Sequence, residues 1–327
     1  MTNIKDVAAH VGMSVSTVSR VLNGYKRVSP ETRARVEKAI RELNYQPDEL
    51  ARQMKQDTAP LIGIIVPDIT NPFFSSIARG AQRAAEEADY TVLLCDTNNS
   101  TKQEKRAVSL LNRYRAAGII SASIAPEDVS NDLYSDQENV IFVDNIPVLK
   151  QDCSCVTINN YLATCELIQK LLDAGCKKLC AIVGPSSESS FADRLRGYMD
   201  TLTAAGLPIP PESIHNGDCT IASGAKQMQA ILDSGYRPDA VFAANNFMAY
   251  GAAQVLMQAG VNIPEDIAIA TFDVFDHTHL IDNQFIYVEQ PAADIGYVAA
   301  KACIDRDKNK DSNAACCKHI LKYNIHG

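Results

Sequence analysis

The chain of 327 residues lacks the features of a membrane-spanning or exported protein. It has no run of about 18 apolar residues, the length that a helix needs to cross a bilayer. Its first residues, MTNIKDVAAH, do not form a basic segment followed by an apolar one, as a secretory signal does. We therefore expect a cytoplasmic protein with no membrane partner, in a compartment that keeps thiols reduced.

The cysteines lack the spacing of a metal site. The chain has ten of them, and the close pairs are Cys153 and Cys155, Cys176 and Cys180, and Cys316 and Cys317. None of these pairs gives the repeated C-x-x-C pattern of a zinc centre. We expect free thiols that pack as small apolar side chains, and no metal or other cofactor.

The chain also lacks a convincing set of catalytic residues. An enzyme needs a nucleophile with a base, paired carboxylates or a metal set. The nearest candidates are the run from Asp276 to His279 and the loop GPSSESS from Gly184. The two histidines of the run alternate too closely for one helix face, and the loop lacks the Gly-Lys-Ser of a phosphate-binding loop. The sequence therefore predicts a protein that is not an enzyme.

A net basic charge is missing from the chain as a whole but not from its first part. The formal net charge is -8. Residues 1 to 59 carry ten Lys or Arg against seven Asp or Glu, whereas the rest carries 21 against 32. This asymmetry directs phosphates to the N-terminal end.

Residues 4 to 23, IKDVAAHVGMSVSTVSRVLN, have the pattern of two short helices joined by a tight turn. Ile4, Val7, Ala8 and Val11 recur at the spacing of one helix face, and Gly12 marks the end of that helix. The second helix has Ser14 as its expected N-cap and a buried stripe at Val18, Val21 and Leu22. The side chains left to point outward are those of Ser16, Thr17, Ser19 and Arg20. Because this layout places a second helix in the DNA major groove, it predicts DNA recognition.

Two further helices are expected before the main body of the chain. Ser29 and Pro30 begin a third helix, whose apolar stripe lies within residues 36–43. After a break at residues 44–47, the segment 48–56 predicts a short helix that is marginal alone in water. We expect it to order on a second copy of itself or on DNA, and a plain linker helix is the alternative.

From Leu61 the pattern changes to strands that alternate with helices, which predicts doubly wound parallel sheets. Strands are expected at 61–67, 91–96, 117–123, 139–144, 155–158, 178–184, 239–245 and 266–273, with a last one at 319–325. Helices are expected at 73–88, 103–114, 162–173, 192–205, 222–233, 247–259 and 291–305. The series forms two blocks of similar size, so we expect two lobes with a cleft at the carboxyl ends of their strands.

Both regions match one known family. The N-terminal motifs are IKDVA, GMSVSTVSRVLN and VSPETRARVEKAIRELNYQPDELAR, and they resemble the DNA-binding headpiece of the LacI/GalR transcriptional regulators. The resemblance continues through IGIIVPDITNPFF, RLRGY, AGLPIP, PDAVFAANNFMAYGA, IPEDIAIATFD and QPAADIG, so it covers almost the whole chain.

The resemblance implies an all-α helix-turn-helix headpiece joined to an α/β periplasmic-binding-protein-like (type I) two-lobed regulatory core. The headpiece would take residues 1–46, a hinge helix or linker 47–59, and the core 60–327. Within the core, the N-lobe would hold about 60–158 and 290–317, and the C-lobe about 159–289 and 318–327. Three crossover strands would join the lobes.

The resemblance also assigns roles on DNA. Val15, Ser16 and Arg20 would face base edges, where Arg20 can form a bidentate pair of bonds to a guanine and Val15 offers only apolar contact. Thr17 and Ser19 would hold phosphates, which position the protein without reading sequence.

The family's hinge helices enter the minor groove together, and a leucine of each opens the central base step. Met54 stands at that position here, and methionine is apolar and unbranched, so we expect it to serve as the wedge. Because each headpiece reads half a site, a homodimer on an approximately palindromic double-stranded operator is expected. No leucine heptads follow at the C-terminus, so a tetramer is not supported.

The effector site implied by the resemblance lies between the lobes. The expected effector-binding residues are Asn71, Phe73, Phe74, Asp144, Arg194, Asn245 and Asp273. Carboxylates accept from hydroxyls, and Arg and Asn donate to ring and hydroxyl oxygens, so this set suits a sugar or sugar phosphate. Structural hydrogen bonds at strand ends are the alternative role for each. Cys219 stands where many members have a stacking aromatic, and Val274 where a second Asp is usual, so the effector class follows from the family alone.

The predicted function is a sequence-specific DNA-binding transcriptional regulator, a repressor of a carbohydrate-use operon that a small effector controls. One alternative is a solute-binding protein of the periplasmic-binding class, which would not need residues 1 to 59. Another is a regulator with a nucleobase or phosphocarrier-protein corepressor; Lys301 stands where regulators of the phosphocarrier kind tend to have arginine.

Overall fold

The structure is a computed structural model that describes residues 3–22, 25, 28–45, 58–134, 139–275, 284–309 and 316–327. They divide into two compact units, Met1–Ala59 and Pro60–Gly327. The hinge helix expected at 48–56, with Met54, lies outside the described residues. So does the run from Asp276 to His279.

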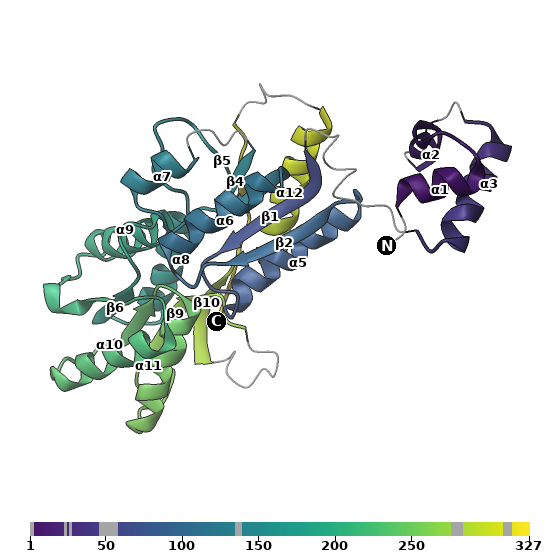
Figure 1. The fold of residues 1–327 in the computed structure, drawn as a ribbon. Helices are drawn as coiled ribbons and strands as arrows, with labels where there is room; N and C mark the ends of the chain where they lie inside the picture. Colours follow the sequence, from purple (N-terminus) through teal and green to yellow (C-terminus); the bar gives the residue numbers. More distant parts are fainter. Residues whose placement is uncertain are drawn as a thin grey trace. The chain divides into compact units, whose positions relative to one another are not determined.

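Three helices form the described part of the first unit, the headpiece. They are α1 (Ile4–Val11), α2 (Val15–Leu22) and α3 (Pro30–Glu42) (Figure 1). Asn3 and Asp6 form a capping box at the start of α1, and Gly12 ends that helix in the left-handed region with a φ of 64°. Ser29 caps α3 directly before Pro30, as predicted.

The apolar stripes of the three helices meet in one small core. Val7, Val18 and Val36 are completely buried there, and each contributes roughly 1.5–3 kcal/mol by leaving water. Tyr45, beyond the predicted stripe, is buried in the same core. Arg35 donates from Nη2 to the carbonyl of Val11 at 3.0 Å, which links α3 to the end of α1. The outward face of α2 is therefore set by what its inward face buries.

The N-lobe of the second unit is built on a six-stranded sheet in the order β11-β5-β4-β3-β1-β2. Its strands are β1 (Ala59–Val66), β2 (Thr91–Asp96), β3 (Ala116–Ser121), β4 (Val140–Val143), β5 (Ser154–Ile158) and β11 (Lys318–Leu321). Its helices are α5 (Pro72–Glu86), α6 (Thr101–Arg113), α7 (Glu127–Tyr134) and α12 (Ala292–Asn309). Ile62 and Ile64 of β1 pack with α5 and α12, whereas Ile65 packs with α6 and α7 on the other face. Helices thus cover both faces, as expected for a parallel sheet.

The C-lobe has a second six-stranded sheet in the order β12-β10-β9-β8-β6-β7. Its strands are β6 (Leu179–Val183), β7 (Ile214–Asn216), β8 (Ala240–Ala243), β9 (Ala268–Phe272), β10 (Phe285–Glu289) and β12 (Asn324–His326). Its helices are α8 (Asn160–Asp173), α9 (Ser189–Ala204), α10 (Ile221–Asp233) and α11 (Asn246–Gln258), with a 3-10 turn at Pro211–Ser213. Every residue of β6, β8 and β9 is buried. Only β12 runs antiparallel to its neighbour among the recorded pairs.

The chain passes between the lobes three times: after β5, after β10, and between β11 and β12. The last passage corrects the predicted lobe boundary, which placed all of 318–327 in the C-lobe and one strand at 319–325. Instead β11 pairs in parallel with β5 of the N-lobe, and only β12 joins the C-lobe sheet. No glycine or proline in HILKYNI signals the change of sheet, and the largely exposed β11 gives no burial pattern to read. The sequence analysis also missed α7, β7 and β10.

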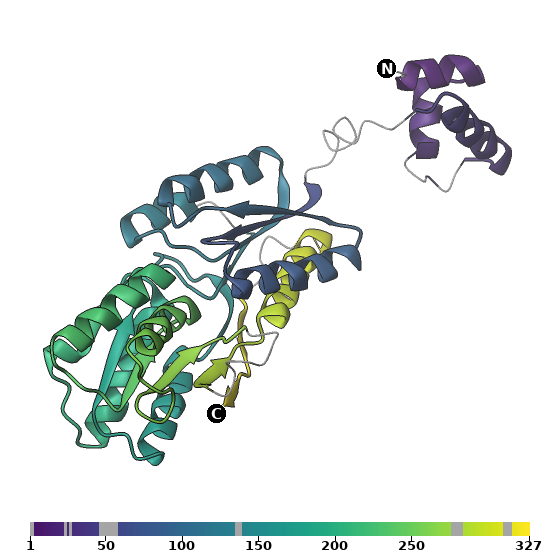
Figure 2. The same cartoon turned by 90° about the horizontal axis from the view of Figure 1, so that it is seen from below.

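Two helices far apart in sequence lie side by side on one face of the N-lobe sheet. Figures 1 and 2 show α5 and α12 in this arrangement. A Cβ on Gly80 would lie 1.7 Å from the carbonyl oxygen of Ala293, and one on Gly296 would lie 1.9 Å from that of Ile77. The two backbones therefore touch at positions where only glycine fits.

All ten cysteines are free thiols. Cys155, Cys180 and Cys303 are buried, as predicted for small apolar side chains, but Cys316 is exposed and the others are partly exposed. Among the described residues, no group of three or more His, Cys, Asp or Glu is placed to hold a metal ion. No helix in the described part of the chain is both long and apolar enough to cross a membrane.

Candidate functional site

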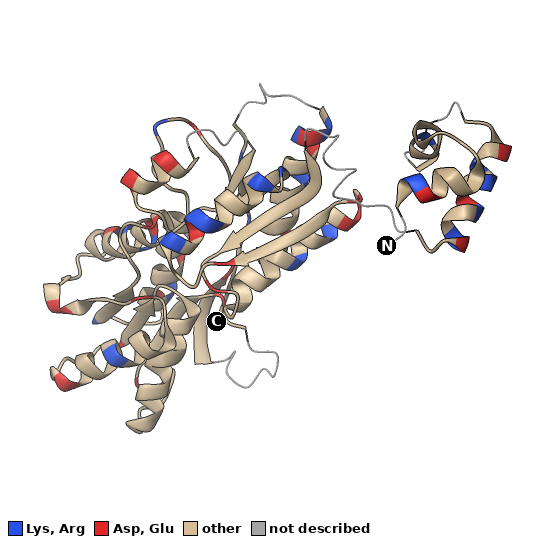
Figure 3. Cartoon of the chain, in the orientation of Figure 1, with Lys and Arg blue, Asp and Glu red and all other residues tan. Residues whose placement is uncertain are grey.

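The outward face of α2 presents the residues predicted to read DNA. Val15, Ser16 and Arg20 are exposed, whereas Val18 and Val21 on the opposite face are buried. The headpiece helices carry both signs of charge (Figure 3), so the excess of basic residues is modest. The face of α2 is thus available for base contacts, while the contacts themselves stay a prediction.

Hydroxyl groups gather at the amino end of α2. Ser14 accepts from the backbone N–H of Thr17 at 3.2 Å, which confirms the predicted N-cap. Its Oγ also lies 2.8 Å from Ser16 Oγ and 2.9 Å from Thr17 Oγ1. Thr17 and Ser19 are partly buried. The dipole of a helix favours a phosphate at this end, so the geometry suits the phosphate contacts expected of the hydroxyls.

The second site is a cavity between the two lobes, at the carboxyl ends of their strands. It encloses about 580 Å³, part of which is open to solvent. All seven predicted effector-binding residues line it: Asn71, Phe73, Phe74, Asp144, Arg194, Asn245 and Asp273. Aromatic and polar side chains converge on it, as they do in small-molecule sites.

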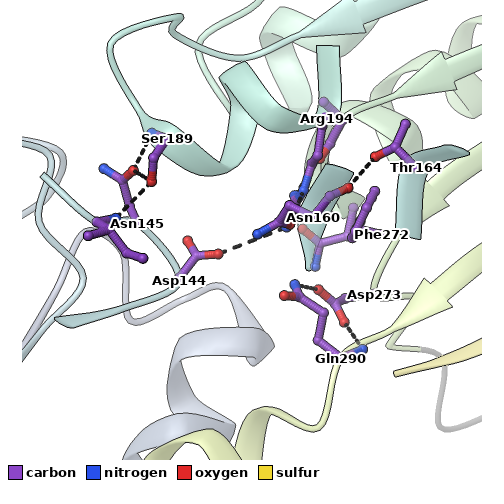
Figure 4. Close-up of polar contacts among 12 residues, drawn as sticks. Asp144, Asn145, Asn160, Thr164, Ser189, Arg194, Phe272, Asp273 and Gln290 are labelled. Carbon is purple, nitrogen blue, oxygen red and sulfur yellow. Dashed lines mark hydrogen bonds and ion pairs between the residues drawn. The ribbon is translucent and has the colours of Figure 1, made fainter. Parts of the chain in front are cut away.

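Arg194, from α9, is the most heavily engaged side chain of this cavity (Figure 4). It is 3 % exposed. Its Nε donates to Asn160 Oδ1 at 2.8 Å, and its Nη1 donates to the carbonyl of Ala244 at 2.7 Å. The guanidinium carbon lies 3.7 Å from the ring centre of Phe272, and Nη2 lies 3.9 Å from Asp144 Oδ1. The bonds from Nε and Nη1 hold the guanidinium group in place. Its third nitrogen, Nη2, forms no hydrogen bond within the described residues.

Gln290, which was not predicted to line the cleft, binds the carboxyl group of Asp273. Gln290 donates from its backbone N to Asp273 Oδ1 at 2.9 Å and from Nε2 to Oδ2 at 2.6 Å. The remaining oxygen of that amide, Oε1, is buried without a partner among the described residues. Among the fully buried side-chain atoms of the cavity lining, the donor Nη2 of Arg194 and the acceptor Oε1 of Gln290 have no hydrogen-bond partner in the described residues. Buried polar atoms normally have partners, so both atoms point to a ligand that supplies them.

The backbone is unusual at four positions around the cavity. Asp144 and Asp273 each have a φ of 57°, Asn99 has a φ of 53° and Cys219 has a φ of 69°. Non-glycine residues in this left-handed region are uncommon and cluster at binding sites. Asp tolerates it because its short side chain can bond locally. At the ends of β4 and β9 this conformation turns the chain where each carboxyl group lines the cavity.

Burial raises the pKa of three carboxyl groups here. For Asp144 the nearby Arg194 opposes the rise. For Glu188, burial and the charge of Asp144 together raise the pKa to about 8. For Asp273, burial raises the pKa to about 7 although the bonds from Gln290 oppose it. Near neutral pH, Glu188 and Asp273 are therefore able to accept or donate hydrogen bonds.

Besides the ion pair of Arg194 with Asp144, hydrogen bonds from three N-lobe residues join the lobes beside the cavity, and one of them is the bond from the N–H of Ile146 to Ser189 Oγ at 2.8 Å. Asn71 and Asn246, both buried, exchange amide hydrogen bonds of 3.1 Å in both directions. Asn145 accepts from both the backbone N and the Oγ of Ser189, at 2.5 and 2.9 Å (Figure 4). A change of lobe angle must therefore break or rebuild these bonds.

Two of the predicted effector-binding residues, Asn71 and Asn245, use their side chains for hydrogen bonds within the protein. Asn71 Oδ1 caps α5 through the N–H of Phe73. Asn245 caps α11 through the N–H of Met248, and its Nδ2 donates to the carbonyl of Cys219 at 3.1 Å. These two asparagines thus form structural hydrogen bonds, as in the alternative role, but the bonds cap helices, and only Asn245 follows a strand closely.

Several residues that line the cavity were not singled out from the sequence. The most polar or aromatic of them are Asp68, Asn99, Glu188, Phe191, Asn246, Phe247, Phe272 and Gln290. Six of them lie in stretches already singled out: Asp68 in IGIIVPDITNPFF, Glu188 in GPSSESS, Asn246 and Phe247 in PDAVFAANNFMAYGA, Phe272 in IPEDIAIATFD, and Gln290 in QPAADIG. A polar residue that follows a strand could have been predicted to line the cleft. Only the positions known from the family were chosen in this way.

The chain combines a two-lobed core, with a cavity between its lobes, and a helix-turn-helix headpiece. Known proteins share both parts. Residues 3–48 match the model of the bacterial regulatory proteins of the lacI family. Residues 59–318 match the model of periplasmic binding proteins and the sugar binding domain of the LacI family.

Individual proteins are similar to this chain over nearly its whole length. The HTH-type transcriptional repressor CytR of Escherichia coli strain K12 is 35% identical over 306 residues, which cover 93% of this chain and 89% of that protein. The ribose operon repressor of the same strain is 32% identical over 308 residues, 94% of this chain and 93% of that protein. In fold, a lac repressor dimer bound to operator and the anti-inducer ONPF gives a TM-score of 0.85 at 24% identity, over 100% of this chain and 98% of that one.

The chain therefore belongs to the LacI family. It is a DNA-binding transcriptional regulator and not an enzyme. The match over residues 3–48 also removes the alternative of a solute-binding protein without a regulatory role.

Proposed function

We propose that this protein is a cytoplasmic repressor that binds an approximately palindromic operator as a homodimer and responds to a small effector in its cleft. The two relatives above are named as repressors, and the matched core is described as a sugar binding domain. The proposed response is release of the operator when the effector binds.

On the DNA side, the exposed face of α2 reads bases. Arg20 is the main reader because a bidentate pair to guanine discriminates by roughly 1–3 kcal/mol. Val15 and Ser16 add weaker contacts, and Thr17 and Ser19 hold phosphates. Met54 acts as the minor-groove wedge.

On the effector side, the charges of the cavity favour a neutral molecule with several hydroxyl groups over a sugar phosphate. The cavity is lined by four carboxyl groups and one arginine: Asp68, Asp144, Glu188, Asp273 and Arg194. The positive charge of Arg194 already lies beside Asp144. A phosphate would bring further negative charge to a cavity with four carboxyl groups and one cation, whereas hydroxyls can both donate to the carboxyl groups and accept from Nη2 of Arg194.

The observation that carries this proposal is the pair of unused polar atoms. The free donor of Arg194 and the free acceptor of Gln290 lie in one cavity with aromatic side chains. A sugar satisfies such a site because it presents hydroxyls at its edge and C–H groups on its face, where Phe74 and Phe272 supply apolar contact.

The proposed switch is a change of lobe angle. The effector favours one arrangement of the lobes only if it binds the two arrangements with different affinity. The bonds between Asn71 and Asn246 and between Asn145 and Ser189 are the contacts that differ. The hinge segment transmits the change to the headpiece.

The test is a thermal-shift screen of neutral pentoses, hexoses and nucleosides against their phosphates, followed by gel shifts on DNA upstream of the gene. We expect a neutral compound to raise the melting temperature and to weaken operator binding. Stabilisation by phosphorylated compounds only would contradict the neutral effector. Failure to bind any specific DNA, with or without ligand, would overturn the proposed repressor.

A further inference from the structure

Four of the ten cysteines gather at one edge of the N-lobe sheet, away from the cleft. Cys153 and Cys155 lie at the start of β5, and Cys316 and Cys317 directly precede β11, the edge strand that pairs with it. Neither proposed site uses them.

The strand register places Cys153 beside Cys316. The parallel ladder pairs Cys155 with Lys318, and the N–H of Cys155 donates to the carbonyl of Cys317 at 2.9 Å. Cys153 and Cys316 precede the two strands. Continuing the same register two residues back sets them opposite each other on one face, because side chains alternate. Neighbouring strands are about 4.8 Å apart, and disulfides join Cα atoms that are about 4.4–6.8 Å apart.

Contacts of the neighbouring residues support this placement. The thiol of Cys316 donates to the carbonyl of Asp152 at 3.1 Å, so its sulfur lies against the residue before Cys153. Nζ of Lys318 lies 3.5 Å from Asp152 Oδ1 on the same side. Cys317 instead packs with the core on the other face of the sheet, and its N–H donates to Ser154 Oγ at 3.0 Å.

Exposure decides which sulfur reacts first. Cys316 is exposed and Cys153 is partly exposed, whereas Cys155 is only 3 % exposed. An oxidant in solution therefore meets Cys316 first, and Cys153 is the partner on the same face that can reach it.

We propose that Cys153 and Cys316 form a thiol pair that a hydroperoxide oxidises to a disulfide. The thiolate of Cys316 attacks the peroxide oxygen and becomes a sulfenic acid, and the peroxide leaves as an alcohol or water. The sulfur of Cys153 then attacks that of Cys316, loses its proton, and expels the oxygen as water. Two thiols lose two electrons in total, and one peroxide gains them.

The disulfide joins two strands that both lead into crossovers. β5 continues to α8, and β11 continues to β12, each in the C-lobe. Oxidation thus fastens the C-terminal segment to the N-lobe sheet, which makes this edge a redox-sensitive element separate from the effector cleft.

The test treats the reduced full-length protein with one equivalent of hydrogen peroxide. We expect the loss of two thiols, their recovery with dithiothreitol, and a melting temperature about 5 °C higher in the oxidised form. Trypsin leaves Cys153, Cys155 and Cys165 on one peptide and Cys316 and Cys317 on another. The linked peptides therefore show that the two segments are joined, but not through which sulfurs.

Variants identify the sulfurs. C155S, C317S and the C-lobe control C165S should keep the cross-link, and C316S should abolish it. C153S should stop at a sulfenic acid on Cys316, which dimedone traps. The proposal is overturned if no two thiols are lost, if the cross-link survives C153S or C316S, or if it joins two chains on a non-reducing gel.

Discussion

Replacing Arg194 with methionine tests the electrostatics of the cleft most directly. Methionine has similar length and no branch, so it removes the charge and the hydrogen bonds while keeping most of the packing against Phe272. We expect the R194M variant to fold less stably, by an amount that depends on pH.

The size of the effect follows from the contacts. Arg194 gives up bonds of 2.8 and 2.7 Å to Asn160 and Ala244, and Asp144 loses a cation 3.9 Å away. Removing one partner of a buried ion pair costs about 3–5 kcal/mol. Asp273, whose raised pKa Arg194 also opposes, loses the same support.

The sign of the pH dependence follows from the carboxyl groups. Without Arg194 the pKa values of Asp144 and Asp273 rise further, so the folded state keeps protons that the unfolded chain releases near pH 4. Each carboxyl then loses about 1.4 kcal/mol of stability per pH unit above its unfolded pKa, up to its folded pKa. The variant should therefore lose most at pH 8 and clearly less at pH 5.

The measurement is urea unfolding at both pH values, followed by circular dichroism because the chain has no tryptophan. The R194M/D144N double variant should recover part of the loss at pH 8. R196M is the matched control, because Arg196 lies on the same helix in an exposed pair with Asp193 and should change the unfolding free energy by less than about 1 kcal/mol. An equal loss at both pH values, or no recovery with D144N, would refute this account of the cleft.

Two more outcomes are expected. R20A should weaken binding to the specific operator about 10- to 100-fold in an anisotropy titration, because a bidentate base contact is worth roughly 1–3 kcal/mol, while weak, salt-sensitive binding to other DNA remains. R41A removes the same charge from α3 and serves as its control; sequence preference that survives R20A would show that α2 does not read the bases. E188Q should make the protein more stable than the parent at pH 8 but not near pH 4.5, because burial raises the pKa of Glu188 to about 8 and its stability contribution falls as pH rises between these values, by at most about 1.4 kcal/mol per pH unit. Parallel stability curves for E188Q and the parent across pH 4.5–8 would contradict that reasoning.

The parts that local pattern determines were predicted from the sequence. The apolar spacing from Ile4 to Leu22 is enough to define two helices and the outward face of α2, because both are consequences of what each helix buries. Likewise the buried runs of β1, β6 and β9 identify their strands. Asp144 and Asp273 follow such strands, so their presence at the rim of the cavity was predictable.

The remaining parts depend on contacts between distant segments. Gln290 reaches Asp273 only because β10 lies beside β9. Asn71 meets Asn246 only because the lobes face each other. The sequence does not show that these pairs of residues lie close together. It also does not show that the side chains of Asn71 and Asn245 cap helices.

The division of the C-terminal segment between two sheets also constrains how the protein folds. The N-lobe sheet lacks β11, and the C-lobe sheet lacks β12, until residues 318–326 have been synthesised. The close contact that Gly80 of α5 makes with α12 likewise cannot form until α12 has been synthesised. Contacts of such long sequence separation slow folding and leave apolar surface exposed during synthesis. Neither lobe can therefore be completed on the ribosome before the other, and loss of residues 318–327 would leave both without an edge strand.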